Sequence, residues 1–155
     1  MAVGPSVGNI LMQQGNTNVP LYYVESTWTI SVTLVGGTGN TVPQYYTKSA
    51  RYTRIGNLCF CRILLDGDGG DEGAGSGQLH ISLPITVSTS QKADYTIAGH
   101  FHNGATENIS FVQPVAGDTV AAVFVQTSIS QTAAATGADQ NNTIRAMSFD
   151  FYYEV

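Results

Sequence analysis

One stretch near the beginning of the chain constrains the fold most, because it alternates strictly between two kinds of side chain. From residue 28 to residue 34, the even positions are apolar and include the only tryptophan, while the odd positions carry hydroxyl groups. A repeat of two residues is typical of a β-strand with one face in a core and the other in water. We therefore expect an irregular connector from Leu21 that becomes a strand at Ser26-Thr27. Its core-facing residues are Trp28, Ile30, Val32 and Leu34.

Strand-like runs continue to the end of the chain. Residues 58–65 form a nearly continuous apolar run, which predicts a strand covered on both faces, and Gly56-Asn57 predicts a two-residue turn before it. No helical stripe extends over ten residues, and turn signals recur about every 8–12 residues. The predicted fold class is all-β, an antiparallel β-sandwich of jelly-roll type. The other strands are expected at residues 45–47, 51–55, 78–84, 94–103, 109–112, 120–129 and 145–155.

The predicted domain organisation is one head domain behind a lead-in. Residues 1–24 contain several glycines and prolines with little periodicity, so we expect an extended segment, followed by the β-sandwich head at residues 25–155. Within the head, residues 36–44, 66–77 and 130–142 are expected to be exposed loops.

The composition excludes several classes of function. Charged residues make up only 11% of the chain and the net charge is −5, so a surface that follows nucleic-acid phosphates is not expected. No apolar run is long enough to span a membrane, which takes about 18 residues or more. Cys59 and Cys61 are too far apart along a strand for an unstrained disulfide, so we expect two buried free thiols. Free thiols, and an N-terminus without a signal-peptide pattern, fit synthesis in a reducing cytoplasm.

Two groups of residues are candidate metal ligands, each with a simpler interpretation. His100 and His102 lie two apart in a predicted strand, so both imidazoles share one face and several copies around a symmetry axis could bind a transition metal. Alternatively they are ordinary surface or glycan contacts, together with Asn103. Asp66, Asp68 and Asp71 could bind calcium, but a glycine-rich acidic loop is more often a solvated tip. We expect neither a metal nor another cofactor.

The tyrosines suggest a binding surface. They occur in adjacent pairs, so in a strand one ring of each pair points outward while its neighbour can enter the core. Outward rings such as Tyr45, Tyr46 or Tyr152 can stack on sugars, or they can lie in a subunit interface, where tyrosine is also enriched. No nucleophile elbow or other catalytic pattern is present, so we expect no enzyme activity.

Three short motifs, in order, resemble the C-terminal domains of bacteriophage tail fibres and tailspikes. VESTWTISVTL, residues 24–34, is similar to the entry pattern E-x-G-T-W-T-P of that family. YTRIG, residues 52–56, and GSGQLHISLP, residues 75–84, are similar to the two blocks that follow there. Ser26, Ile30 and Ala50-Arg51 depart from the usual glycine, proline and glycine. The likeness covers residues 25–84.

This resemblance implies a protein of the virion, in the phage tail, made in the cytoplasm of a host bacterium. It implies a homotrimer whose heads bind bacterial surface polysaccharide or lipopolysaccharide, with residues 1–24 as the tether from the fibre shaft. Tailspike enzymes usually carry catalysis on an upstream β-helix that this chain does not contain. Two alternatives remain, a structural trimerisation cap and an accessory carbohydrate-binding module of a capsule depolymerase.

Overall fold

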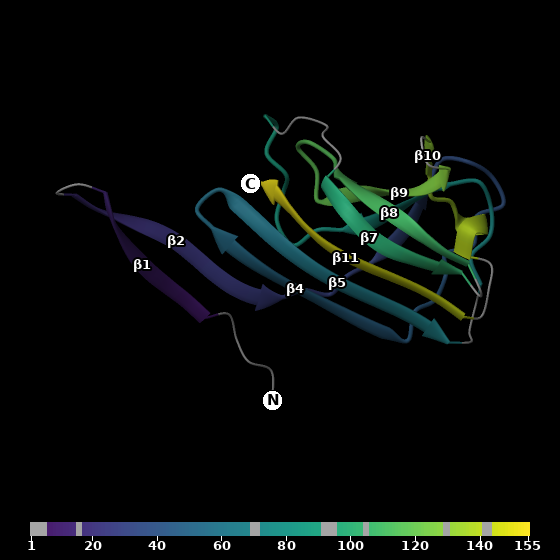
Figure 1. Ribbon diagram of the computed structural model, residues 1–155, viewed down its shortest axis with the longest axis horizontal. Helices are drawn as coiled ribbons and strands as arrows, with labels where there is room; N and C mark the ends of the chain where they lie inside the picture. Colours follow the sequence, from purple (N-terminus) through teal and green to yellow (C-terminus); the bar gives the residue numbers. More distant parts are fainter. Residues whose placement is uncertain are drawn as a thin grey trace.

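The computed structural model describes residues 6–14, 17–68, 72–90, 96–103, 106–128, 131–140 and 144–155. These residues form β-strands and one short 3-10 helix (Figure 1). In chain order, the elements are β1 (Ser6–Gln14), β2 (Thr17–Thr27), β3 (Val32–Val35), β4 (Thr47–Ile55), β5 (Leu58–Asp68), β6 (Gln78–Ser82), β7 (Thr96–Asn103), β8 (Thr106–Pro114), β9 (Val120–Ser128), β10 (Gln131–Ala134), η1 (Gly137–Gln140) and β11 (Ile144–Glu154).

All strands belong to one sheet, and every paired strand is antiparallel to its neighbour. The order is β1-β2-β4-β5-β11-β7-β8-β9-β6-β3, with β10 paired to β9. Figure 1 shows that the sheet is curled and that the hairpin of β1 and β2 projects from one end of it. The predicted all-β antiparallel class is therefore confirmed.

The core lies inside this curl and receives side chains from both halves of the sheet. Ile63 on β5 and Phe149 on β11 belong to the same buried cluster as Leu79 on β6 and Val123 on β9. The two halves thus bury a common set of apolar side chains, which is the main favourable term in folding.

Strand β11 shows most clearly how the sequence encodes sidedness. Met147, Phe149, Phe151 and Tyr153 are buried, whereas Asp150, Tyr152 and Glu154 are exposed, as the alternation predicted. Buried Arg145 lies on the inner face as well. The alternation at residues 79, 81 and 83 is confirmed in the same way, and β6 ends before Pro84.

The organising stretch around Trp28 is divided between two strands, so the prediction of one strand from residue 27 is wrong. β2 ends at Thr27, residues 28–31 are not in a strand, and β3 begins at Val32. The reason is that β2 pairs with β4 while β3 pairs with β6, at the other end of the strand order, so the chain must cross between the two. The sidedness survives this crossing, since Ile30 and Val32 are buried.

Trp28 stabilises the crossing from both sides. Its backbone N–H donates to the carbonyl of Ala50 on β4 at 3.2 Å, and its indole Nε1 donates to the carbonyl of Ser82 on β6 at 3.2 Å. Its ring also meets that of Tyr52 edge to face, with 6.2 Å between centroids. A single side chain therefore connects strands that are far apart in the strand order.

The amino-terminal segment contains more regular structure than the sequence predicted. β1 and β2 pair along their whole lengths, from Ser6–Glu25 to Gln14–Thr17, although little periodicity was expected there. β2 is paired with β4 only from Tyr23 to Thr27, so at Pro20 one edge of β2 has no partner strand. Proline is tolerated there because no backbone N–H is needed for a hydrogen bond on that edge. β2 also runs through residue 24, where the lead-in was expected to end.

β4 and β5 form a hairpin whose turn was predicted correctly. Gly56 has a φ of +61°, a conformation that glycine adopts without strain, and Ile55 pairs with Leu58 across the turn. Of the expected strands at residues 45–47 and 51–55, residues 47 and 51–55 belong to one strand, β4, whereas Tyr45 and Tyr46 lie outside any strand. β5 extends to Asp68, so the first residues of the expected acidic loop are in regular structure.

The predicted burial of both faces of β5 is wrong. Cys59, Cys61, Ile63 and Leu65 are buried, but Phe60 and Leu64 on the opposite side are 41% and 43% exposed. The cysteines are buried free thiols, as predicted, with 3.9 Å between their sulfur atoms. Their mutual hydrogen bond and burial raise the pKa of the Cys61 thiol, so it is not activated as a nucleophile.

The expected exposed loop at residues 130–142 is also wrong for the part that is described. Residues 131–134 form β10 on the edge of β9, and residues 137–140 form η1. Ala135 and Gln140 are completely buried. This segment can pack although it has no alternating pattern, because its backbone groups form hydrogen bonds with β9 and its alanine side chains are small.

Candidate functional site

The side of β4, β5, β11 and β7 that is turned away from the core is called the outer face here. Cross-strand register arranges its residues in rows, because residues directly opposite each other share a face of the sheet. One row contains Arg51, Arg62 and Asp150, and the next contains Thr53, Phe60 and Tyr152. A third row contains Ser49, Leu64, Ser148, His100 and Ile109.

Phe60 and Tyr152 form an exposed aromatic pair on this face. Their ring centroids are 5.7 Å apart with an interplanar angle of 38°, and Tyr152 is 43% exposed. Each ring limits the freedom of the other, so the pair offers two inclined apolar ring faces at low entropic cost. Such a surface can stack against the apolar face of a planar or cyclic ligand.

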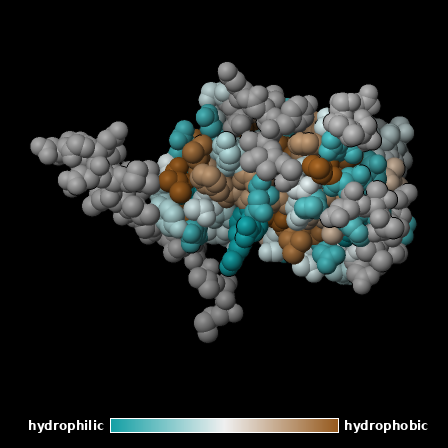
Figure 2. All heavy atoms as spheres, viewed as in Figure 1, coloured by the Kyte–Doolittle hydropathy of each residue, from teal (hydrophilic) through white to brown (hydrophobic). Residues whose placement is uncertain are grey.

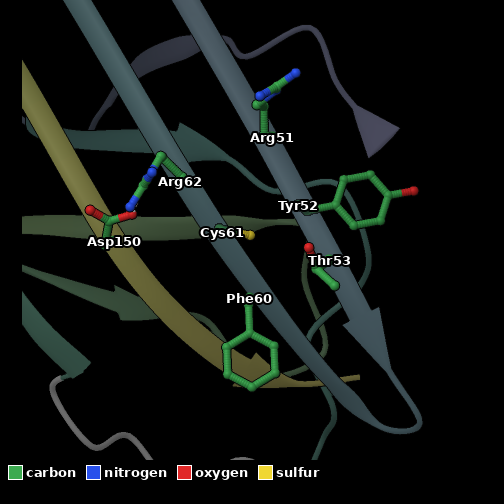
Figure 3. A pocket seen from close by; sticks show the side chains of 7 residues that line it. All are labelled: Arg51, Tyr52, Thr53, Phe60, Cys61, Arg62 and Asp150. Carbon is green, nitrogen blue, oxygen red and sulfur yellow. Dashed lines mark hydrogen bonds and ion pairs between the residues drawn. The ribbon is translucent and has the colours of Figure 1, made fainter. Parts of the chain in front are cut away.

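A groove of about 330 Å³ adjoins the aromatic pair. It is lined by Arg51, Tyr52, Thr53, Phe60, Cys61, Arg62 and Asp150 (Figure 3). β4 and β5 run side by side along the groove. Arg62 on β5 and Asp150 on the neighbouring strand β11 point toward each other. In Figure 2, hydrophobic side chains lie on either side of a hydrophilic strip over these strands. The groove therefore offers charged and hydroxyl groups next to an apolar platform.

Arg62 and Asp150 form an ion pair at the surface. Nε of Arg62 donates to Oδ1 of Asp150 at 2.7 Å, and this contact raises the pKa of the guanidinium. Because both side chains are mostly exposed, the pair contributes little to stability. Its main consequence is geometric, since it fixes the orientation of the guanidinium plane beside the groove.

The structure separates the two members of a predicted tyrosine pair. Tyr45 is buried, and its hydroxyl donates to Oε1 of Gln140 at 2.7 Å, so its ring is not available to a ligand. Burial raises the pKa of Tyr45, and the nearby Arg145 only partly opposes that rise. Tyr46 is 66% exposed, in the irregular segment before β4.

Neither of the predicted histidines lies beside the aromatic pair. His100 is exposed on the outer face, opposite Ser148 of β11. Ser148 is four residues from Tyr152, about 13 Å at ~3.3 Å per residue, so His100 is not in the groove. His102 and Asn103 are half-buried at the end of β7. Of the predicted glycan contacts, only Tyr152 adjoins the groove.

Among the described residues, the predicted metal ligands do not lie together. Asp66 is exposed in β5, opposite Thr47, while Asp71 and the side chain of Asp68 lie outside the described residues. Within the part of the chain that the structure describes, no group of three or more His, Cys, Asp or Glu side chains is close enough to hold a metal ion.

Sequence reasoning missed Phe60 and Arg62 because residues 58–65 were interpreted as buried on both sides, and it missed Arg51 and Asp150 because the strands that lie beside β5 could not be known. The signal that could have revealed the first two is Arg62 itself, a charge at the centre of an apolar run. A charge at an even position makes the even side of the strand the solvent side, which exposes Phe60 and Leu64 as well.

No protein-family model, curated protein or solved structure matches the chain. Among the described residues, no helix is long and apolar enough to cross a membrane.

Proposed function

We propose that this chain is the receptor-binding head of a bacteriophage tail fibre, which attaches to bacterial surface polysaccharide as a homotrimer and carries out no catalytic step. The family likeness of residues 25–84 supports the viral setting. The observation that carries the binding role is the exposed pair of Phe60 and Tyr152 beside a groove with charged walls.

The physical basis is the match between this surface and a sugar. A pyranose ring has an apolar face of C–H groups, which stacks on an aromatic ring, and a rim of hydroxyls, which needs donors and acceptors. Arg51, Arg62, Asp150 and Thr53 supply both kinds of group within the groove.

The test is cell binding by the intact chain and by variants of the aromatic pair. Phe60→Ala and Tyr152→Ala should each weaken binding to susceptible bacteria or to a glycan array by about tenfold, the loss typical of a central aromatic anchor. Tyr22→Ala is the matched control, because Tyr22 is equally exposed but lies on β2, away from the groove. Equal binding by all three variants would contradict this site.

A structural trimerisation cap is the second candidate, and it is favoured by the amino-terminal hairpin. The first charged residue of the chain is Glu25, near the end of β2, so residues 6–14 and 17–24 of the hairpin carry none of the charges that normally protect a strand edge. A two-stranded hairpin is also marginal alone and gains stability from a further strand or surface. A trimeric mass in solution together with no binding to cells or glycans would favour the cap over the adhesin.

A further inference from the structure

Two arginines stand side by side in the groove on the outer face. Arg51 on β4 and Arg62 on β5 are directly opposite each other in the register, and both are exposed. Like charges in that arrangement repel each other. Asp150 is the only carboxylate among the residues that line the groove, so one positive charge is left unbalanced. The chain as a whole carries a net charge of −5, which makes this local excess unusual for its surface.

Both guanidinium groups have donors left for a ligand. Arg62 uses Nε for Asp150, and in the part of the chain that is described its terminal nitrogens contact no other hydrogen-bond acceptor. Arg51 has no ion-pair or hydrogen-bond partner for its side chain among the described residues. A guanidinium presents its donors in a planar fork that matches a carboxylate. In Figure 3 the Arg51 guanidinium points away from Arg62, so sharing one anion requires the exposed Arg51 side chain to take another rotamer.

The aromatic pair lies one row from the arginines. Same-face residues two apart on a strand, such as Phe60 and Arg62, are separated by about 6.6 Å at ~3.3 Å per residue. A sugar ring stacked on Phe60 or Tyr152 would therefore place an exocyclic carboxylate within reach of Arg51 and Arg62.

We propose that the groove binds a carboxylate-bearing sugar unit, such as a hexuronic acid of an acidic polysaccharide. The carboxylate bonds to Arg51 and to the terminal nitrogens of Arg62, while the ring stacks on the aromatic pair. This inference rests on the proposed glycan-binding function and adds the chemical class of the sugar. A neutral hexose fits the platform but leaves the second arginine without its counter-charge.

The experiment is an NMR titration of the full-length ¹⁵N-labelled chain, observing the arginine Nε–Hε signals. The probes are sodium glucuronate, glucose and sodium phosphate. Glucuronate should shift the signals of Arg51 and Arg62 and bind at least about tenfold more tightly than glucose. Arg51→Gln should weaken glucuronate binding by a similar factor and glucose binding much less, because only glucuronate loses a charged partner. Arg54→Gln is the matched control, because Arg54 is on the same strand but stacks on Tyr22, with 4.7 Å from Cζ to the ring centroid.

The other outcomes separate this inference from the proposed function. Equal binding of glucose and glucuronate, with no effect of Arg51→Gln, would overturn the acidic preference and leave a sugar site. Phosphate shifting the same signals as strongly would show a general anion site and also overturn it. If the chain binds cells but neither sugar shifts the arginine signals, the glycan site lies elsewhere. If the chain neither binds cells nor responds to either sugar, the glycan-binding function itself is wrong.

Discussion

Individual residues of this protein are constrained most where two strands approach closely. At Gly99, β7 passes against β11 with no space for a side chain. A Cβ atom there would collide with the carbonyl oxygen of Ser148 and come within 2.6 Å of Cδ1 of Phe149. Other side chains connect neighbouring strands, such as Arg54 on β4, whose guanidinium stacks on the ring of Tyr22 on β2.

Gly99→Ala should destabilise the fold by about 3 kcal/mol or more, because the added methyl group forces β7 away from β11. Urea unfolding measures the difference. His100→Ala, at the next position on the outer face, is the control and should cost much less. A Gly99→Ala protein as stable as the wild type would mean that the two strands are not in this register.

His80 gives the fold a dependence on pH. It is half-buried on β6, and burial lowers its pKa below the ordinary value of 6.5, although Asp118 partly opposes the shift. The unfolded chain therefore binds the proton at a higher pH than the folded chain does. The free energy of unfolding should fall as the pH drops below about 6.5 and level off below the pKa of the folded state.

His80→Gln removes this contribution, so its free energy of unfolding should fall less than that of the wild type between neutral and mildly acidic pH. Urea unfolding at several pH values measures both. Identical pH profiles would contradict the assigned shift.

At the scale of elements, β5 decides what the outer face can do. Its odd residues belong to the core and its even residues, Phe60, Arg62 and Leu64, face outward. β5 lies between β4 and β11, so its outward residues join theirs in continuous rows. The groove and the aromatic pair both depend on this one-sided strand.

Substitutions at neighbouring positions of β5 should therefore differ sharply. Leu64→Ala should change the free energy of unfolding by less than about 0.5 kcal/mol, as expected for a surface position. Ile63→Ala should cost about 2–5 kcal/mol, because it leaves a cavity in the core. Chemical denaturation of both proteins at equal concentration decides this. A loss at Leu64 as large as that at Ile63 would show that the outer face is covered.

At the scale of the whole molecule, buried polar groups connect segments that are distant in the sequence. The side-chain amide of Gln140 in η1 accepts from the Tyr45 hydroxyl at 2.7 Å and donates to the carbonyl of His102 at 3.2 Å. Arg145 donates to the carbonyl of Gln44 and lies over the Tyr45 ring at 5.7 Å. This network holds the segment before β4 against β7, β11 and η1.

Gln140→Ala should cost about 1–3 kcal/mol, because it leaves the buried Tyr45 hydroxyl without its acceptor. Amide hydrogen exchange should also become faster in η1 and at the end of β7. Asp139→Asn, on the same turn of η1 but only half-buried, is a comparison that keeps Gln140 in place. Unchanged stability of Gln140→Ala would mean that residues 137–140 are not packed on the core.

How much could be predicted from the sequence depended on whether the signal was local. The inward row of β11, the Gly56-Asn57 turn and the buried thiols were predicted correctly from nearby residues alone. Tyr152 was identified because its neighbour Tyr153 had to be the inner ring. Arg51 was missed because its role depends on the strands placed beside it. Tyr45 was included because no residue near it in the sequence indicates its buried hydrogen bond to Gln140.

The sequence by itself determined that the chain is all-β and, where apolar and polar residues alternate, which side chains face inward, since a repeat of two residues fixes the sidedness of a strand wherever it is placed. Only the tertiary structure decided where strands begin and end, which strands pair, and what covers each face. Those outcomes come from contacts between distant segments: the crossing at Trp28 exists because β2 and β3 have different partners, and residues 131–140 are ordered because β9 and Tyr45 are beside them.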